Sequence, residues 1–330
     1  MTVTIHDVAQ RANVSISTVS RAFTSPGLVK AQTRERVLTA ATELGYESSG
    51  SPHQVPVSRT GQIAIIVSEL GNPFFTGVLN GVQARARQDD VAVLFANSDE
   101  DPATEQNLVR KMAGQVDGIV LCSPSMSDDQ VLALAEQTTL VLLNREVETI
   151  PSIVMDAADG MRQAIEHLAA LGHRRCAYLG GPRASWSNQA RKRGLREAAE
   201  LHGIEVVEFG PFPPVFEGGL QGADLALAAD ATAIIAYNDL VAFGALARLS
   251  ARGVPVPAEV SLVGFDDLVF AAISAPPLTS IAMPTEAAGR AAVTLLLGML
   301  DGETEVGTTR VLDTHLIVRA TTAPPPGTSR

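Results

Sequence analysis

Three side chains of contrasting chemistry, Ile16, Ser17 and Arg21, share the outer face of a short helical pattern over residues 15–23. The major groove of DNA presents a distinct pattern of donors and acceptors for each base pair, so a helix that enters it needs exposed readers near its start. An arginine guanidinium suits a guanine edge, and an isoleucine suits a thymine methyl group. The pattern favours DNA recognition, with a solvated surface arginine as the alternative interpretation of Arg21.

Two further helical patterns flank this stretch. Residues 5–12 follow Thr4, a candidate N-cap with Asp7 three residues later, and residues 31–44 form the other pattern beyond a stop at Pro26-Gly27. Two short helices joined by a tight turn and braced by a third form a helix-turn-helix, so we expect such a head over residues 1–46. The side chains expected to face inward are Ile5, Val8, Ala9, Ala12, Val19, Ala22, Val37, Leu38, Ala41 and Leu44.

The distribution of charge separates this head from the rest of the chain. Residues 1–60 hold six basic and four acidic side chains, whereas the remainder holds 19 basic and 32 acidic ones, within a net charge of -11 over 330 residues. A mildly basic head on an acidic body indicates a nucleic-acid contact at one end. Residues 47–60 (ESSGSPHQVPVSRT) have no amphipathic periodicity and are predicted to be a hinge or linker.

Several protein classes are disfavoured by the sequence. No apolar run approaches the roughly 18 residues of a membrane span, and the first residues lack the pattern of a secretion signal, so we expect a cytoplasmic protein. Cys122 and Cys176 lie in apolar stretches that suit buried, reduced thiols. The six histidines show no metal-ligand spacing and no glycine-rich phosphate loop follows a strand, so neither an enzyme nor a metal or cofactor is expected.

Beyond Gly61, short apolar runs alternate with helical stretches, which predicts an α/β fold with parallel sheets covered by helices on both faces. Nine runs are too many for one mononucleotide-type sheet, and a break near Asp156 suggests two similar halves. Such sheets bind ligands at the carboxyl ends of their strands, so a pocket is expected between the halves. Residues 323–330 (APPPGTSR) are predicted to be a flexible tail. The predicted strands are 63–67, 91–96, 118–122, 140–143, 153–155, 176–179, 206–209, 233–236 and 260–263.

A series of motifs occurs in a fixed order along residues 2–322. The head contains VTIHDVAQRANVSISTVSRAF, TRERV and ELGY; the body contains NPFF (72–75), DGIVL (117–121), HLAALGHRRCAYLGGP (167–182), RKRG (191–194), YND (237–239), and VPAEVSLVGFDD through PPLTSI (256–281). In this order and spacing the motifs resemble the LacI/GalR family of bacterial transcription regulators.

The resemblance implies a helix-turn-helix head, a hinge, and a two-lobed core of doubly wound sheets like that of a periplasmic sugar-binding protein. Three crossovers would join the lobes. The first lobe would span residues 61–157, completed by about 285–312, and the second residues 158–284, completed by about 313–322. The family works as dimers or pairs of dimers, so homodimers on a palindromic operator are implied, with the two heads about 34 Å apart.

The resemblance also assigns roles in the head. Positions 16 and 17 would choose bases, and Arg21 would contact a guanine edge. In the hinge, the position of the family's minor-groove leucine falls on Val55, flanked by Pro52 and Pro56. Proline inside a helix costs roughly 3 kcal/mol, so the hinge either forms a very short turn or stays extended. The residues placed for phosphates are Thr4, Asn13, Thr18 and Thr33.

In the core, the resemblance implies an effector cleft lined by strand ends and helix starts. Arg191 would grip the effector and Asp266 would accept hydrogen bonds from its hydroxyl groups, although Arg191 also lies in a basic run that could simply be solvated. Trp186 and Ser187 could offer a ring face and a hydroxyl. The candidate effector-binding residues are Phe74, Phe75, Asn144, Arg145, Trp186, Ser187, Arg191, Asn238, Asp239 and Asp266.

Some of these candidates have a simpler structural interpretation. At least one of Phe74 and Phe75 is expected to pack beneath the first helix of the core, and Asp239 could be only a helix cap. Asp156, which lies at the break, is also expected to be a cap.

The predicted function is a DNA-binding regulator, most consistent with a repressor controlled by a small sugar-like effector. A carboxylate, a guanidinium, amides and aromatic faces suit polyols, whereas a purine needs aromatic planes on both sides, and the chain has only 14 Phe, Trp and Tyr residues. A purine or nucleoside effector, a corepressor and a phosphorylated metabolite remain alternatives within the family. A transport-type sugar-binding protein shares the core fold, but a helix-turn-helix argues against it.

Overall fold

The computed structural model describes residues 4–16, 18–19, 22, 29–44, 59–303 and 307–327, and the chain divides into two units, Met1–Arg59 and Thr60–Arg330. The first unit contains α1 (Ile5–Ala12) and α3 (Ala31–Leu44), which confirms both predicted ranges. Asp7 accepts hydrogen bonds from the Thr4 backbone N–H (2.8 Å) and from Thr4 Oγ1 (2.7 Å), so the predicted N-terminal cap forms. The backbone is also helical at Ile16, Thr18, Val19 and Ala22.

A small apolar core holds the described part of the head together. Val8, Val19 and Val37 are fully buried within it. The prediction that Leu38 faces inward is wrong, because its side chain is 37 % exposed. The buried positions of α3 instead follow a spacing of three and four residues from Val37, which places alanines rather than Leu38 on the inner face. The other buried members of this core are Ala9, Ala12, Ala22, Ala40 and Ala41.

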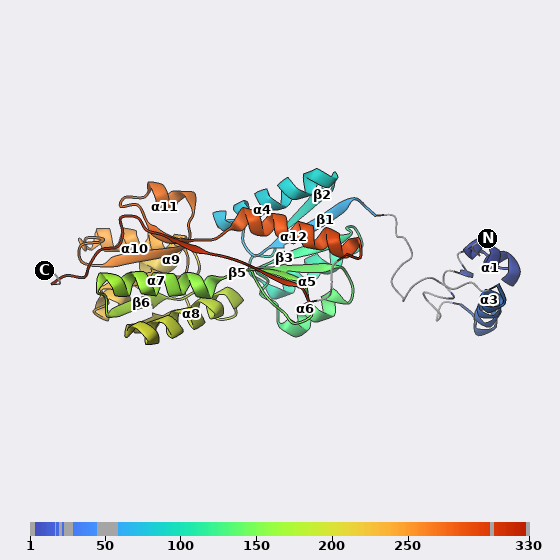
Figure 1. The fold of residues 1–330 in the computed structure, drawn as a ribbon, viewed down its shortest axis with the longest axis horizontal. Helices are drawn as coiled ribbons and strands as arrows, with labels where there is room; N and C mark the ends of the chain where they lie inside the picture. Colours follow the sequence, from blue (N-terminus) through green and yellow to red (C-terminus); the bar gives the residue numbers. More distant parts are fainter. Residues whose placement is uncertain are drawn as a thin grey trace. The chain divides into compact units, whose positions relative to one another are not determined.

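The second unit is built on two six-stranded sheets, which confirms the prediction of two similar α/β halves (Figure 1). The first sheet has the order β11-β5-β4-β3-β1-β2 and the second β12-β10-β9-β8-β6-β7. Every neighbouring pair is parallel except β10 with β12. The strands of the first sheet are β1 (Gln62–Val67), β2 (Ala92–Asn97), β3 (Gly118–Cys122), β4 (Leu140–Leu143), β5 (Ser152–Met155) and β11 (Thr309–Leu312); those of the second are β6 (Arg175–Leu179), β7 (Glu205–Phe209), β8 (Ala233–Ala236), β9 (Ser261–Asp266), β10 (Thr279–Ala282) and β12 (His315–Ile317).

All nine predicted strands are present, but the sequence did not reveal β10, β11 and β12. In β10, Thr279 and Ser280 are fully buried although they are polar, because each has hydrogen-bond partners. β11 is an edge strand whose side chains are mostly exposed. Neither strand therefore carries the continuous apolar run by which buried parallel strands are recognised.

Helices cover both faces of each sheet, as Figure 1 shows for α4 and α12 against one face of the first sheet and α5 and α6 against the other. In the second lobe α7 packs against α8, and α9 against α10. The helices of the first lobe are α4 (Pro73–Ala86), the 3-10 turn η2 (Arg87–Asp89), α5 (Pro102–Met112), α6 (Asp128–Ala135) and α12 (Thr285–Leu300); those of the second are α7 (Ala157–Leu171), α8 (Trp186–His202), α9 (Phe216–Ala228), α10 (Asp239–Ala251) and the short α11 (Val269–Ile273). None of the helices among the described residues has the length and apolarity needed to span a membrane.

Within the described residues the chain passes between the sheets at three points: from β5 into α7, from β10 into α12, and from β11 to β12. At the first point Asp156 caps α7 by accepting from the Asp159 N–H (2.9 Å), which confirms its expected role as a cap. One apolar cluster that includes residues of α4, α12, α7 and α8 runs through both lobes, and it contains both free, buried cysteines. The lobes therefore share a continuous core on one side.

The start of the predicted tail is anchored. His173 lies 2.8 Å from Thr232 Oγ1 and 3.0 Å from the Ala323 carbonyl oxygen, and Ser261 Oγ donates to that same carbonyl. The Ala323 N–H in turn donates to Ser261 Oγ (3.0 Å). The prediction of a flexible tail from residue 323 onward is therefore wrong at its first residue, because His173 and Ser261 hold it against β9.

The contact between α4 and α12 depends on glycine. A Cβ atom added to Gly81 would lie 2.1 Å from the carbonyl oxygen of Glu286, and one added to Gly289 would lie 2.2 Å from that of Val78. Because these are backbone atoms, the helices would have to separate to admit a methyl group.

We expect Gly81→Ala to lower the free energy of unfolding by about 1–3 kcal/mol, the usual cost of overpacking, even though alanine favours a helix by up to about 1 kcal/mol. Gly114→Ala is the matched control, because nothing lies within 4 Å of the added atom. Urea unfolding followed by circular dichroism measures both, and equal stability of the two variants would contradict the backbone contact.

Candidate ligand-binding cleft

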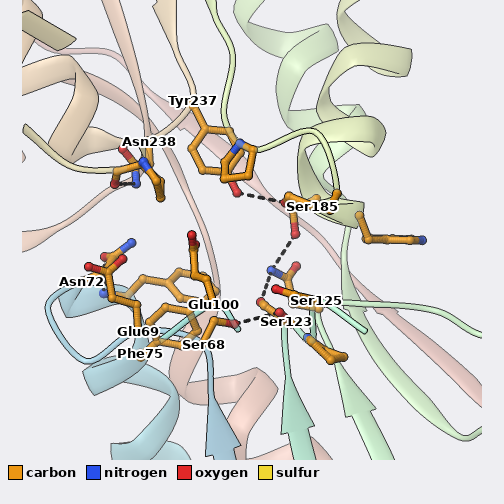
Figure 2. Close-up of a pocket in the computed structure, with 18 of the residues that line it drawn as sticks. Ser68, Glu69, Asn72, Phe75, Glu100, Ser123, Ser125, Ser185, Tyr237 and Asn238 are labelled. Atoms are coloured by element: carbon orange, nitrogen blue, oxygen red, sulfur yellow. Dashed lines mark hydrogen bonds between the residues drawn. The ribbon is translucent and has the colours of Figure 1, made fainter. Parts of the chain in front are cut away.

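A cavity of about 220 Å³ lies between the two lobes, at the carboxyl ends of strands from both sheets. Residues after β1, β2, β3 and β4 form one wall, and residues after β6 and β8 and at the end of β9 form the other. This is where parallel α/β sheets bind ligands, and it agrees with the pocket expected from the sequence. Figure 2 shows polar side chains of the two walls facing one another across the space.

The floor of the cavity contains a buried ion pair. Arg191 Nη2 lies 3.5 Å from Asp266 Oδ1, and each side chain is 4 % exposed. The guanidinium carbon lies 3.8 Å from the centre of the Phe265 ring and 4.5 Å from that of Tyr237, so the group is stacked as well as paired. Arg191 also donates to the Tyr237 carbonyl oxygen.

Asp266 is held in an unfavourable environment. Burial raises the pKa of its carboxyl group to about 7, although the positive charge of Arg191 and a hydrogen bond with Asn72 lower it. Its backbone has a φ of 107°, which is rare for any residue other than glycine. Strained backbone and a perturbed carboxylate in a cleft are typical of functional sites.

Asn144 joins the two lobes. Its Nδ2 donates to Ser123 Oγ and to Ser187 Oγ, both at 3.0 Å, and Ser187 belongs to the opposite lobe. Its Oδ1 atom is buried and has no hydrogen-bond partner among the described residues. An acceptor in this position can receive a donor from a ligand.

The helices that begin at the cleft are capped by polar side chains that also line it. Asn72 accepts from the Phe74 N–H (3.0 Å) at the start of α4, and Asn238 accepts from the Val241 N–H (2.9 Å) at the start of α10. Ser185 caps α8 and lies 3.1 Å from the Tyr237 hydroxyl (Figure 2). α8 begins at Trp186, so Arg191 lies in its second turn and does not open the helix.

Aromatic rings supply the apolar part of the lining. Phe74 and Phe75 pack edge to face with ring centres 5.1 Å apart, and both belong to the core cluster while also lining the cavity. Trp186 and Tyr237 line it from the other lobe. Trp186 is the single tryptophan of the chain, so its fluorescence reports on this site alone.

Two of the predicted effector residues do not line the cavity. Arg145 points away from it, donates to the carbonyl oxygens of Pro124 and Met126, and pairs with Asp128 at 2.6 Å. Asp239 is completely buried and accepts from Ser280 Oγ (2.6 Å) and the Leu268 N–H (2.7 Å), and its burial raises its pKa well above the usual value. Their assignment to the cavity is therefore wrong, because both hold loops behind its walls.

The other eight predicted effector residues all line the cavity, namely Phe74, Phe75, Asn144, Trp186, Ser187, Arg191, Asn238 and Asp266. Sequence reasoning missed further lining residues. Asn72 and Tyr237 lie within the quoted NPFF and YND motifs, which could have marked them. Pro182 also ends a quoted motif. The remainder lie in loops after strands and carry no periodic signal: Ser68, Glu69, Glu100, Pro102, Ser123, Pro124, Ser125, Ala184, Ser185 and Pro214.

In the head, the described candidate residues are at least partly accessible. Ile16 is 42 % exposed, and Asn13, which ends α1, has a left-handed backbone with φ of 54°. Thr4 is exposed, while Thr18 and Thr33 are partly buried. Ser17, Arg21 and Val55, for which base reading and minor-groove insertion are predicted, lie outside the described residues.

Known proteins share both parts of this architecture. Residues 4–49 match bacterial regulatory proteins of the lacI family, and residues 165–322 match a periplasmic binding protein-like domain. The HTH-type transcriptional regulator DegA of Bacillus subtilis is 30% identical over 98% of this chain and 99% of its own length.

Solved structures of regulators are similar to this chain over nearly its whole length. A transcriptional regulator CelR in complex with cellobiose is 33% identical, with a TM-score of 0.72 over 97% of this chain and 99% of the other. The lac repressor dimer bound to operator and the anti-inducer ONPF is 28% identical, with a TM-score of 0.74 over 98% of this chain and 100% of the other.

The fold and the cleft define a transcription regulator with a helix-turn-helix head and a core built like a periplasmic binding protein. The chain belongs to the lacI family of bacterial regulatory proteins. It is a DNA-binding regulator.

Behind the wall formed by Pro124 and Ser125, Glu105 of α5 is 1 % exposed. Its Oε2 accepts from the N–H groups of Ser125 (3.0 Å) and Met126 (3.1 Å). Burial raises the pKa of Glu105 to about 7, although these bonds and the charge of Arg145 lower it. Its folded pKa thus exceeds the ordinary value of 4.5, so its ionisation weakens the fold as pH rises through this range.

We expect the free energy of unfolding of the native chain to fall relative to that of Glu105→Gln by about 3 kcal/mol between pH 5 and pH 8. Glutamine can still accept both backbone bonds but does not titrate. Urea unfolding at several pH values, followed by Trp186 fluorescence, measures the difference. Parallel pH dependences for the two proteins would show that Glu105 ionises normally.

Proposed function

We propose that this regulator is a repressor whose operator affinity is controlled by a sugar-like effector bound between the core lobes. The observation that carries the proposal is the stacked and paired Arg191–Asp266 group in an interlobe cavity. The solved complex of CelR with cellobiose supports a sugar, and the lac repressor bound to operator supports a repressor. The proposed site of action is operator DNA in the bacterial cytoplasm.

The chemistry of the cleft suits a polyol. A carboxylate and a guanidinium can bond to neighbouring hydroxyl groups, while aromatic faces cover the apolar side of a sugar ring. Arg191 Nε and Asn144 Oδ1 are buried without partners among the described residues, which leaves one donor and one acceptor for a ligand. Eight of the sequence-derived candidates are proposed to contact the effector: Phe74, Phe75, Asn144, Trp186, Ser187, Arg191, Asn238 and Asp266.

Effector control requires that the ligand bind two conformations of the core differently. The polar bonds from Asn144 to Ser187 and between Asn72 and Asp266 join the lobes directly at the cleft. A bound sugar would compete for these side chains and bridge the lobes itself. We propose that this exchange shifts the relative position of the lobes and thereby the operator affinity of the dimer.

Self-association is supported by an exposed apolar face on α11. Val269 is 70 %, Phe270 47 % and Ile273 73 % exposed, which is unusual for neighbouring large apolar side chains. The lac repressor structure is that of a dimer. A homodimer, or a pair of dimers, on a palindromic operator is therefore proposed.

A nucleoside or purine effector is the second candidate. The chain has few aromatic residues, but Phe74, Phe75, Trp186 and Tyr237 all line the cavity, from both lobes. The concentration of these aromatic side chains at the cavity favours a planar base, although the total number of aromatic residues in the chain is small. Titration of adenosine and guanosine beside cellobiose and simple hexoses, followed by Trp186 fluorescence, distinguishes the two candidates.

We expect Asp266→Asn and Arg191→Lys each to weaken binding of the responsive ligand roughly tenfold or more, because a charge-assisted bond contributes about 1.5–3 kcal/mol. Operator affinity without ligand should be unchanged, so both variants should stay on the operator when the native protein leaves it. Trp186 fluorescence measures ligand affinity, and gel shift measures operator affinity.

Glu197→Gln, on the exposed side of the same helix α8, is the control and should behave as the native protein. Unchanged ligand affinity in both variants would remove this ion pair from the site. If the two variants lose operator binding in the absence of ligand, a corepressor mechanism is indicated, in which the ligand strengthens DNA binding.

In the head, Ile16, Ser17 and Arg21 are proposed to read bases, Thr4, Asn13, Thr18 and Thr33 to contact phosphates, and Val55 to approach the minor groove. We expect Arg21→Ala to lose about 1–3 kcal/mol of binding to the cognate operator and less to random DNA. Fluorescence anisotropy on both DNAs at fixed salt measures this. Equal losses on the two DNAs would make Arg21 a phosphate contact.

A further inference from the structure

Two carboxylates in the cavity have no role in the proposed function so far. Glu69 follows β1 and Glu100 follows β2, and both line the cavity. Neither carboxylate forms an ion pair or a hydrogen bond with any other residue in the described part of the chain. Figure 2 shows the Glu100 side chain extending from the first lobe into the space below Tyr237.

The backbone holds Glu100 in this position at a cost. Asp99 and Glu100 have φ values of 51° and 57°, two consecutive left-handed residues that are not glycine. Non-glycine residues adopt such conformations at a cost in free energy, and this strain clusters at functional sites. The Glu100 N–H donates to the Ser68 carbonyl oxygen (2.8 Å), which ties this turn to the end of β1 beside Glu69.

Neighbouring negative charges act on both carboxylates, and Glu100 acts on the opposite wall. Partial burial and the charge of Asp99 raise the pKa of Glu69, and burial and the charge of Glu69 raise the pKa of Glu100. Burial is the main cause that raises the pKa of Tyr237, which belongs to the second lobe, and the charge of Glu100 adds a smaller contribution. The field of these carboxylates therefore extends across the cavity.

The charges that line the cavity do not balance. The acidic and basic residues that line it are Glu69, Glu100, Asp266 and Arg191, and Arg191 is already paired with Asp266. Two negative charges remain without a counter-charge, that of Glu69, which is partly exposed, and that of Glu100, which is exposed. Closing the lobes over a ligand would remove more water from them, and an unpaired buried charge is strongly unfavourable.

A second observation shows that hydrogen-bond acceptors remain unsatisfied in the same cavity. Asn144 is 4 % exposed and directs both of its amide bonds to serine oxygens, which leaves its Oδ1 atom without a partner among the described residues. Apart from the unsatisfied donor Arg191 Nε, these groups are acceptors. A protonated amine offers three donors, no acceptor and a positive charge, and so supplies what these groups lack.

We propose that the effector is an amino sugar, a polyol ring with a protonated amine that lies against Glu69 and Glu100 while its hydroxyl groups face Arg191 and Asp266. The proposal rests on the proposed function, in which the cleft binds a sugar-like effector. It makes Glu69 and Glu100 specificity-determining residues. It also excludes phosphorylated and acidic sugars, since their charge would be repelled.

The test uses the full chain and pairs of probes that differ by the amine: glucosamine with glucose, galactosamine with galactose, and the β-1,4-linked glucosamine disaccharide with cellobiose. Titrations followed by Trp186 fluorescence run at about pH 6.5, below the pKa of roughly 7.7–8 typical of such an amine. At least one amino sugar should bind about tenfold or more tightly than its neutral partner. Its N-acetylated form, which lacks the charge, should lose this advantage.

Glu100→Gln and Glu69→Gln keep the shape of the side chains and remove one charge each. Each should reduce the preference for the amine over the neutral partner at least several-fold. Glu217→Gln, at the exposed start of α9 and outside the cavity lining, is the charge-matched control and should leave the preference unchanged.

The outcomes separate this proposal from the one on which it rests. The amino-sugar assignment is overturned if every neutral sugar binds as tightly as its amino partner, or if the preference for the amine survives both substitutions. If a neutral sugar causes the protein to leave the operator, the proposed function stands. If no sugar of either kind binds at about 10 mM, both proposals are overturned.

Discussion

The rest of the core depends on the interactions of one guanidinium, that of Arg191, which is held almost entirely out of water. Removing Arg191 from water is costly, and the cost is offset by the Asp266 carboxylate, the Tyr237 carbonyl oxygen and two aromatic faces. These groups come from the ends of β8 and β9, so the guanidinium reaches them only if α8 lies close to that sheet edge. At Gly194, one turn beyond Arg191, an added Cβ would lie 2.2 Å from the Ala158 carbonyl oxygen of α7. The position of α8 that lets Arg191 reach these groups thus also requires the close approach of α7 and α8.

The placement of neighbouring residues explains which parts of the site could be predicted. Asn144 and Arg145 both close β4, and sequence order alone assigned both to the cleft. The strand ends at Leu143 and the chain turns at Asn144, whose φ is 59°, so Asn144 faces the cavity while Arg145 holds the loop behind its wall. Asn238 and Asp239 divide in the same way, with the first at the cavity and the second bonded to Ser280.

The fold was more predictable than the site because apolar runs carry a periodic signal. β1, β3 and β8 are continuous apolar segments, and each was located to within a residue or two. Thr279 and Ser280 show the opposite case, since their burial depends on partners more than 30 residues away that no local pattern reveals. Glu69 and Glu100 are similar, because a carboxylate in a loop looks like any solvated residue until the fold places it beside a cavity.

The arrangement of the cores indicates how the lobes can move. On the side of α4, α12, α7 and α8 one apolar cluster runs through both lobes, whereas the opposite faces of the two sheets have separate clusters. Close-packed apolar contacts resist continuous deformation, so relative motion should be confined to the three crossovers and to contacts that can be exchanged. The bonds from Asn144 to Ser187 and between Asn72 and Asp266 are contacts of that kind, since a ligand hydroxyl or amine can replace either partner. The groups that recognise the ligand are therefore also the groups that set the distance between the lobes, and binding cannot satisfy them without changing the balance between open and closed forms.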